Sequence, residues 1–177
     1  MGTPLETPRS SYPGIKLRTE GQRAVLMVAH VDQVPRRDYK TNEPIIRNGK
    51  PAMQDVITGI VMPGTTGVIT DNGNDLGVTD GAVVRDFIAG KARYEMYQAK
   101  KDHGAWEVGD VIEHRHAGTE GVIDDRGNAV RDASGHQVQA KKHTFRIRRS
   151  KPEEAALVAK AEDLHRQLAA GAAANND

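Results

Sequence analysis

Basic side chains are concentrated in two short segments of a chain that is nearly neutral as a whole. The sequence has 25 Lys and Arg residues against 24 Asp and Glu residues, a formal net charge of +1. Residues 36–51 carry a net charge of +3, and residues 141–151 contain six basic residues and no acid. Because a local field attracts a polyanion even when the total charge is small, both segments predict phosphate binding. A solvated surface is the alternative for either segment alone.

Aromatic side chains accompany these cations and could provide stacking surfaces for nucleobases. Sequence-tolerant binding of single strands combines cations along a groove with flat rings on which bases stack. Tyr39 lies among charged neighbours in the first segment, and Tyr94 follows Arg93 on one flank of a predicted helix, where packing is the alternative. The predicted contacts to single-stranded DNA are Arg36, Arg37, Tyr39, Lys40, Lys50, Arg93, Tyr94, Lys141, Lys142, Arg146 and Arg148.

The sequence offers no comparable pattern for catalysis or for a cofactor. The chain has no cysteine, which excludes disulfides and thiolate metal sites. His114 and His116 would share one face of a strand, as two metal ligands must, but no motif supplies a third ligand. The chain has no phosphate loop of the Gly-Lys-Ser/Thr type and no nucleophile elbow. We therefore expect no enzyme activity, no cofactor and no metal.

The candidate contacts are predicted to lie on strands or between them. Apolar runs predict strands at residues 22–32, 53–62, 68–70, 110–117 and 141–149. The segment between the first two strands contains Asn48-Gly49, a strong tight-turn signal that predicts a protruding hairpin with its tip at Gly49. Gly59, inside the second strand, indicates a bulge or a sharp bend.

The last predicted strand has one apolar and one cationic face. Phe145 and Ile147 point inward by alternation, while Arg146 and Arg148 point outward. The preceding segment, residues 119–139, is polar and rich in turn formers, so we expect a long loop or a mobile hairpin there, without an internal repeat.

Two helices complete the expected secondary structure. Apolar residues at spacings of three and four predict a helix at residues 81–101, capped by Asp80, with its stripe formed by Val84, Phe87, Ile88, Ala92 and Met96. Ser150 and Glu153 form a capping-box pattern for a second helix at residues 151–170. Its thin stripe comprises Ala156, Ala159, Leu164 and Leu168. The second helix packs either on its own domain or on another copy, which would give a homo-oligomer.

The order of these elements predicts a mainly β fold, a five-stranded oligonucleotide-binding (OB) barrel with a helix between strands 3 and 4 and a C-terminal helix. In that architecture the first and last long loops flank the binding face. We expect a flexible arm at residues 1–14, the barrel at 15–150, and the C-terminal helix with a disordered tail at 151–177. No run approaches the ~20 apolar residues of a membrane helix, so we expect a cytoplasmic protein without membrane contact.

The runs RDYKTNEP and GKPAMQDVIT resemble a family of small proteins of actinobacterial phages, which are thought to bind single-stranded DNA through an OB fold. The matching positions are Tyr39, Thr41, Pro44, Gly49, Lys50, Pro51, Met53 and Gln54. The resemblance covers roughly residues 13–149 and implies DNA replication, recombination or repair in the host cytoplasm. The run LGVTDGAVV departs from the family, which has a basic-aromatic strand before the helix. The alternative is a structural or protein-interaction module, such as a virion component.

Overall fold

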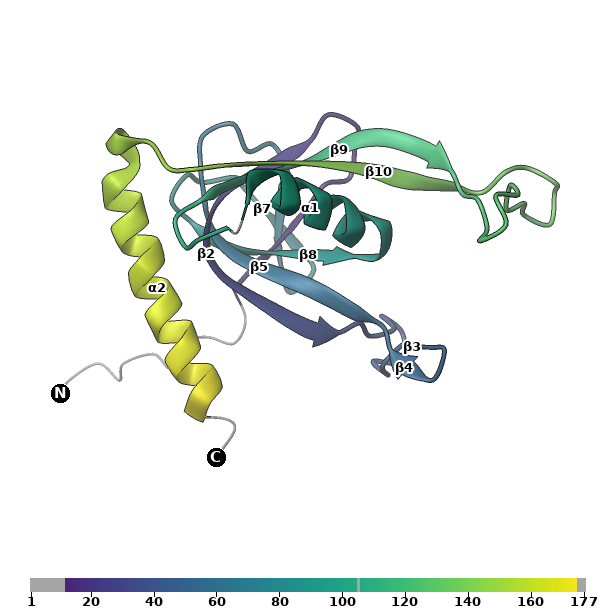
Figure 1. The fold of residues 1–177 in the computed structure, drawn as a ribbon, viewed down its shortest axis with the longest axis horizontal. Coiled ribbons are helices and arrows are strands. Elements are labelled where there is room, and N and C mark those ends of the chain that lie inside the picture. The colour runs from purple at the N-terminus through teal and green to yellow at the C-terminus, as the bar shows by residue number, and fades with distance from the viewer. Residues whose placement is uncertain (1–11, 105, 175–177) are drawn as a thin grey trace.

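The protein forms one large mixed β-sheet with two helices packed against it (Figure 1). The computed structural model describes residues 12–104 and 106–174, to which the counts below refer. The main sheet contains β1 (Gly14–Lys16), β2 (Arg23–Pro35), β5 (Met53–Val61), β6 (Val68–Asp71), β7 (Asn74–Leu76), β8 (Val83–Ala89), β9 (Val111–Gly121) and β10 (Gln139–Arg148). A small second sheet pairs β3 (Ile46–Arg47) with β4 (Lys50–Pro51). The helices are α1 (Gly90–His103) and α2 (Ala155–Ala174), the latter preceded by the 3-10 turn η1 (Pro152–Glu154).

The strands of the main sheet follow the order β10-β9-β2-β5-β8-β1-β6-β7. Neighbours are antiparallel except β1 and β8, whose parallel pairing is limited to Gly14 opposite Arg85. Within the described residues no strand pairing joins the two ends of this sheet into a closed barrel. The five predicted strands correspond to β2, β5, β6, β9 and β10. The predicted class, mainly β, is therefore confirmed.

Alternate residues of β2 face two separate hydrophobic layers. Leu26 and Val28 pack in an inner core that also receives Met96 of α1. Met27 and Ala29 belong to an outer layer, which lies beneath α2. An unbroken apolar run is what a strand covered on both faces requires, because neither face can be left to solvent. The sheet is thus a middle layer between the inner core and the C-terminal helix.

The irregularity expected at Gly59 is present as a shift in strand register. The register between β2 and β5 shifts just after Val28 pairs with Gly59. A Cβ atom at Gly59 would lie 2.9 Å from the Met27 carbonyl oxygen and 3.0 Å from the Leu26 Cβ. Glycine is therefore required here by the close approach of the two strands.

The first predicted helix is wrong in its first half. Residues 83–89 form β8, and α1 begins only at Gly90, so the predicted cap lies outside the helix. Val84 and Ile88 are buried as expected, but they lie on one face of a strand. Phe87 points the other way and is 44% exposed, instead of lying in the core. A spacing of four residues fits both a helix face and a strand face, and pairing with β5 decides between them.

The second helix packs on its own sheet, against β2. Ala161 and Leu164 are buried in the outer layer, and Leu168 packs beside them. Two residues of the predicted stripe, Ala156 and Ala159, are instead exposed. The structure therefore answers one open question, because the apolar stripe of α2 is covered within the same chain.

The cap of this helix lies one residue later than predicted from Ser150 and Glu153. The N–H of Lys151 donates to Glu154 Oε1 at 2.7 Å, and the N–H of Glu154 donates to the Lys151 carbonyl at 2.9 Å. Pro152 occupies the first turn, as expected. The glutamate that caps the helix is thus Glu154, one residue after the Glu153 indicated by the capping-box pattern.

Beyond their paired region, β2 and β5 continue into a protruding segment that we call arm 1 (residues 36–52; Figure 1). Its tip is the turn Asn48-Gly49 between β3 and β4, with φ angles of 52° and 74°. Positive φ at both central residues is characteristic of a two-residue hairpin turn. The predicted turn with its tip at Gly49 is confirmed, but the hairpin that it closes is short and comprises only β3 and β4.

Arm 1 is closed at its base by a ring of three backbone hydrogen bonds. The N–H of Arg36 donates to the carbonyl of Ala52, the N–H of Ala52 to Ile45, and the N–H of Ile45 back to Arg36. Two small hairpins branch from this ring, one on each side of Ile45. The arm is therefore a branched structure and not a single long hairpin.

The segment between β9 and β10, here called arm 2 (residues 122–138), has the same branched structure. The N–H of Val122 donates to the carbonyl of Val138, that of Val138 to Val130, and that of Val130 to Val122. Figure 1 shows both arms projecting from the same end of the molecule.

Arm 2 also contains an internal repeat, contrary to the expectation from the sequence. The runs VIDDRGNA and VRDASGHQ are equivalent, and each places an aspartate, Asp124 or Asp132, at the start of a tight turn. Each carboxylate accepts two backbone N–H groups from the four residues that follow it. The loop predicted at residues 119–139 is thus an ordered pair of turns with a period of eight residues.

Candidate nucleic-acid interface

The basic side chains of arm 1 are free of acidic partners. Within the described part of the chain, none of the five forms an ion pair: Arg36, Arg37, Lys40, Arg47 and Lys50. Arg37 donates to the Asn42 carbonyl at 2.8 Å, which fixes its stem without neutralising its charge. Asp38 turns to the backbone instead, and hydrogen bonds from the N–H groups of Thr41 and Lys40 hold its pKa below the ordinary value. Arm 1 therefore presents an uncompensated positive field to solvent.

Tyr39 is an exposed aromatic residue of arm 1, next to one of these cations. Its side chain is 88% exposed, and the Lys40 ammonium lies 5.5 Å from the centre of its ring. An exposed aromatic ring next to a cation can stack on a base while the cation contacts the neighbouring phosphate. The sequence-based choice of Tyr39 as a stacking residue agrees with this exposure.

The predicted contacts from α1 separate into two kinds. Tyr94 is 61% exposed and stands on the surface. Arg93 turns inward, with Nε 3.3 Å from Asp55 Oδ2 and Nη2 3.1 Å from the Tyr97 hydroxyl. Since Asp55 is only 1% exposed, Arg93 compensates a buried carboxylate. We therefore assign Arg93 to the stability of α1.

Two arginines at the end of β10 are likewise engaged inside the protein. Arg148 donates to both carboxylate oxygens of Glu154, at 2.7 and 2.9 Å. This bidentate pair, together with the Lys151 N–H, lowers the pKa of Glu154 to about 2. Arg148 thus holds the start of α2 to β10.

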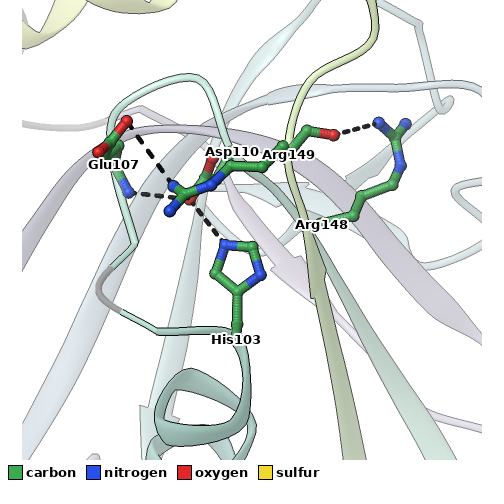
Figure 2. Close-up of polar contacts among 5 residues, drawn as sticks. All are labelled: His103, Glu107, Asp110, Arg148 and Arg149. Carbon is green, nitrogen blue, oxygen red and sulfur yellow. Dashed lines mark hydrogen bonds and ion pairs between the residues drawn. The ribbon is translucent and has the colours of Figure 1, made fainter.

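The neighbouring Arg149 belongs to a polar cluster at the junction of α1, β9 and β10 (Figure 2). Its Nη1 donates to Asp110 Oδ2 at 2.7 Å, and the Glu107 N–H donates to the same oxygen at 2.9 Å. His103 Nε2 lies 3.1 Å from this oxygen as well. The Asp110 side chain is 4% exposed, so its charge depends on these partners. The cluster secures the end of α1 to the sheet.

The cationic face of β10 is consequently smaller than the sequence suggests. Lys141, Lys142 and Arg146 remain exposed, and Lys141 donates to the Leu17 carbonyl at 3.0 Å without losing its charge. Arm 2 adds no positive charge, since three aspartates outweigh two arginines in residues 122–138. The positive surface is therefore concentrated on arm 1, with a minor contribution from β10.

Three histidines meet where β9 and β10 approach β8. His114 and His116 turn inward from β9, as their spacing predicts, and His143 of β10 joins them. His114 contacts Asp86 of β8, and His116 Nδ1 accepts the Gly118 N–H. Among residues 12–104 and 106–174, no group of three His, Cys, Asp or Glu side chains is arranged to hold a metal ion.

A cavity of about 560 Å³ opens beside these histidines, between β1 and β8 on one side and β10 on the other. Phe87, Asp86 and His143 line it, and none of them was selected from the sequence. The available signal was the alternation of Val84, Asp86 and Ile88, which marks a strand with one buried carboxylate. We call this cavity the seam pocket.

The other aromatic residues have structural positions. Phe145 is half-buried, and its ring stacks on His114 with centroids 4.4 Å apart. Trp106 is half-buried against the inner core, with the Lys100 ammonium 5.0 Å from its ring. The position of Phe145 agrees with the inward direction predicted from the alternation in this strand.

Comparison of the chain with models of protein families, with curated proteins and with solved structures finds no match. In the portion of the chain that the structure describes, no helix has the length and apolar character to cross a membrane.

Proposed function

We propose that this protein binds single-stranded DNA without catalysis, and that arm 1 is its main contact surface. The observation that carries the proposal is that arm 1 bears five cations, none of them ion-paired among the described residues, together with the 88% exposed ring of Tyr39. Phosphate contacts from such cations supply affinity, and stacking on an aromatic ring tolerates any base. Exposed Tyr94, Lys142 and Arg146 extend the surface.

The order of elements supports an OB-type architecture. β2, β5, β8, α1, β9 and β10 follow one another as the strands and helix of an OB barrel do, with arm 1 after the first strand and arm 2 before the last. An OB barrel is often partly open, and its long loops border the binding face. The resemblance of arm 1 to the phage family supports a role in DNA replication, recombination or repair.

Fluorescence anisotropy with a labelled oligothymidine tests the proposal. Wild-type protein should bind the single strand better than a duplex of equal length, and more tightly as salt falls. Tyr39→Ala should weaken binding by about 5- to 150-fold, the effect of losing one stacked base. Lys40→Gln should weaken binding of all sequences alike and reduce the salt slope by about 0.7.

Arm 2 provides a matched control for the arm 1 cations. Arg37 and Arg131 each donate Nη1 to a carbonyl of their own turn, Asn42 at 2.8 Å and Gly135 at 2.9 Å. Arg37→Gln should reduce affinity, whereas Arg131→Gln should leave it unchanged. Equal effects of the two variants, or no preference of the wild type for a single strand over a neutral polymer at low salt, would refute the proposal. Salt-independent self-association through the arms would then favour an assembly module.

A further inference from the structure

The seam pocket lies between two unpaired strand edges. β1 pairs with β8 at Arg85 alone, so residues 86–89 have a strand neighbour only on the β5 side. Among the described residues β10 pairs with β9 alone, so its other edge makes no strand pairing. The cavity of about 560 Å³ between these edges falls within the size range of small-ligand sites. Backbone N–H and C=O groups along such edges are available to a ligand.

A chain of two hydrogen bonds, one buried and one partly buried, leads into this pocket. Asp86 Oδ2 lies 2.6 Å from His114 Nδ1, and His114 Nε2 lies 2.8 Å from His143 Nδ1. Asp86 and His114 are 3% and 4% exposed, so both are fixed by their partners. His143 lines the pocket, and its Nε2 has no hydrogen-bond partner among the described residues. Burial and the neighbouring histidines lower the pKa of His143 to about 4, which keeps its ring uncharged near neutral pH.

The remaining lining combines an aromatic surface with cations. Phe87 is 44% exposed at the pocket, an unusual position for a phenyl ring in a sheet. The Arg85 guanidinium lies 5.1 Å from the centre of its ring. Lys16 and Lys141 also line the cavity. The pocket therefore offers a flat apolar surface, a neutral hydrogen-bonding group and positive charge.

We propose that the seam pocket takes one unstacked nucleobase of a bound single strand, an inference that rests on the proposed function. The base stacks on Phe87, its polar edge bonds to His143 Nε2, and the attached phosphate lies near Lys16. A nucleotide is the ligand class that joins a flat apolar ring, edge hydrogen bonds and an anion in one unit. A peptide side chain would lack the anion, and a free phosphate would leave Phe87 uncovered.

An abasic scan of a labelled oligothymidine tests this proposal on the full chain. With the wild type, an abasic site at one position of the strand should weaken binding by about 5- to 150-fold. Phe87→Leu, which keeps the apolar volume but removes the flat ring, should weaken binding of the intact strand and abolish the effect of that abasic site. Leu76→Ala changes an exposed apolar residue on β7 and should alter neither. If every abasic site weakens the binding of Phe87→Leu by the same factor as it weakens the binding of the wild type, the proposal is overturned.

A second measurement separates this proposal from the general one. Thymidine 5′-monophosphate should shift the ring signals of His143 in ¹H–¹³C spectra, and deoxyribose 5-phosphate should not. Equal shifts from both compounds would show an anion site without base recognition and refute the inference. If the wild type binds no oligonucleotide, the proposed function fails. If it binds but the nucleotide leaves His143 unmoved, only the seam pocket proposal fails.

Discussion

Replacing Glu154 by glutamine tests the assignment of Arg148 to the fold. Glu154 is 9% exposed and accepts two hydrogen bonds from Arg148 and one from the Lys151 N–H. These partners lower its pKa from 4.5 to about 2. A shift of that size corresponds to about 3.4 kcal/mol if none of it is screened. Because the Arg148 side chain is 41% exposed, water screens the pair, and we expect about 1 to 2 kcal/mol.

The pH dependence of this effect has a definite sign. A carboxylate with a lower pKa in the folded protein stabilises the fold above its unfolded pKa, and this contribution is lost as the pH falls through the folded pKa. Glu154→Gln should therefore lower the melting temperature at pH 7 by about 2 to 8 °C. The difference from the wild type should shrink between pH 5 and pH 2.

Differential scanning calorimetry over this pH range provides the measurement, with Glu153→Gln as the control. Glu153 is exposed and forms no hydrogen bond or ion pair in the described residues, so its variant should melt like the wild type. A Glu154→Gln protein as stable as the wild type at pH 7, or equally destabilised at pH 2, would refute the reasoning. Arg148→Gln should reproduce the loss of stability and leave oligonucleotide affinity unchanged, in contrast to Arg146→Gln.

Two further predictions concern the sheet. Gly59→Ala places a Cβ 2.9 Å from the Met27 carbonyl oxygen and should cost about 1 to 3 kcal/mol in urea unfolding, whereas Gly77→Ala, with no atom within 4 Å, should cost little. The pKa of His143, about 4 in the folded protein, lies below its usual 6.5, so the unfolded chain binds the proton first and stability should fall from pH 6.5 to pH 4. Urea unfolding of His143→Gln should lose this part of the pH dependence, unlike His136→Gln on arm 2. Identical pH profiles for all three proteins would contradict the assignment.

The sequence was sufficient for the strands whose burial pattern is regular. β2 and β5 are long apolar runs, and β10 alternates Phe145 and Ile147 with basic residues, so both patterns identify strands. β8 escaped detection because the spacing of Val84 and Ile88 fits one face of a helix as well as one face of a strand. The Asp86 carboxylate between them is buried against His114, and that contact joins residues far apart in the sequence.

Those features of the candidate site that depend on neighbouring residues were predictable from the sequence, and those that depend on contacts between distant elements were not. The exposure of Tyr39 and the turn at Gly49 follow from neighbouring residues in one arm. The engagement of Arg148 by Glu154, and of Arg93 by Asp55, depends on how helices dock on the sheet. A count of charges along the chain therefore overestimates the cations available to a polyanion.

The two arms form the same closed ring of backbone hydrogen bonds from different types of residue. The ring uses only main-chain N–H and C=O groups, so any residue except proline can occupy its three positions. In arm 1 every ring residue directly follows a proline, Pro35, Pro44 or Pro51, which restricts the unfolded segment. In arm 2 all three ring residues are valines, whose branched side chains favour extended backbone. Substitutions in the turns of either arm can thus change its charge without disturbing the ring of backbone hydrogen bonds at its base. The same backbone structure therefore carries a net positive charge in arm 1 and a net negative charge in arm 2.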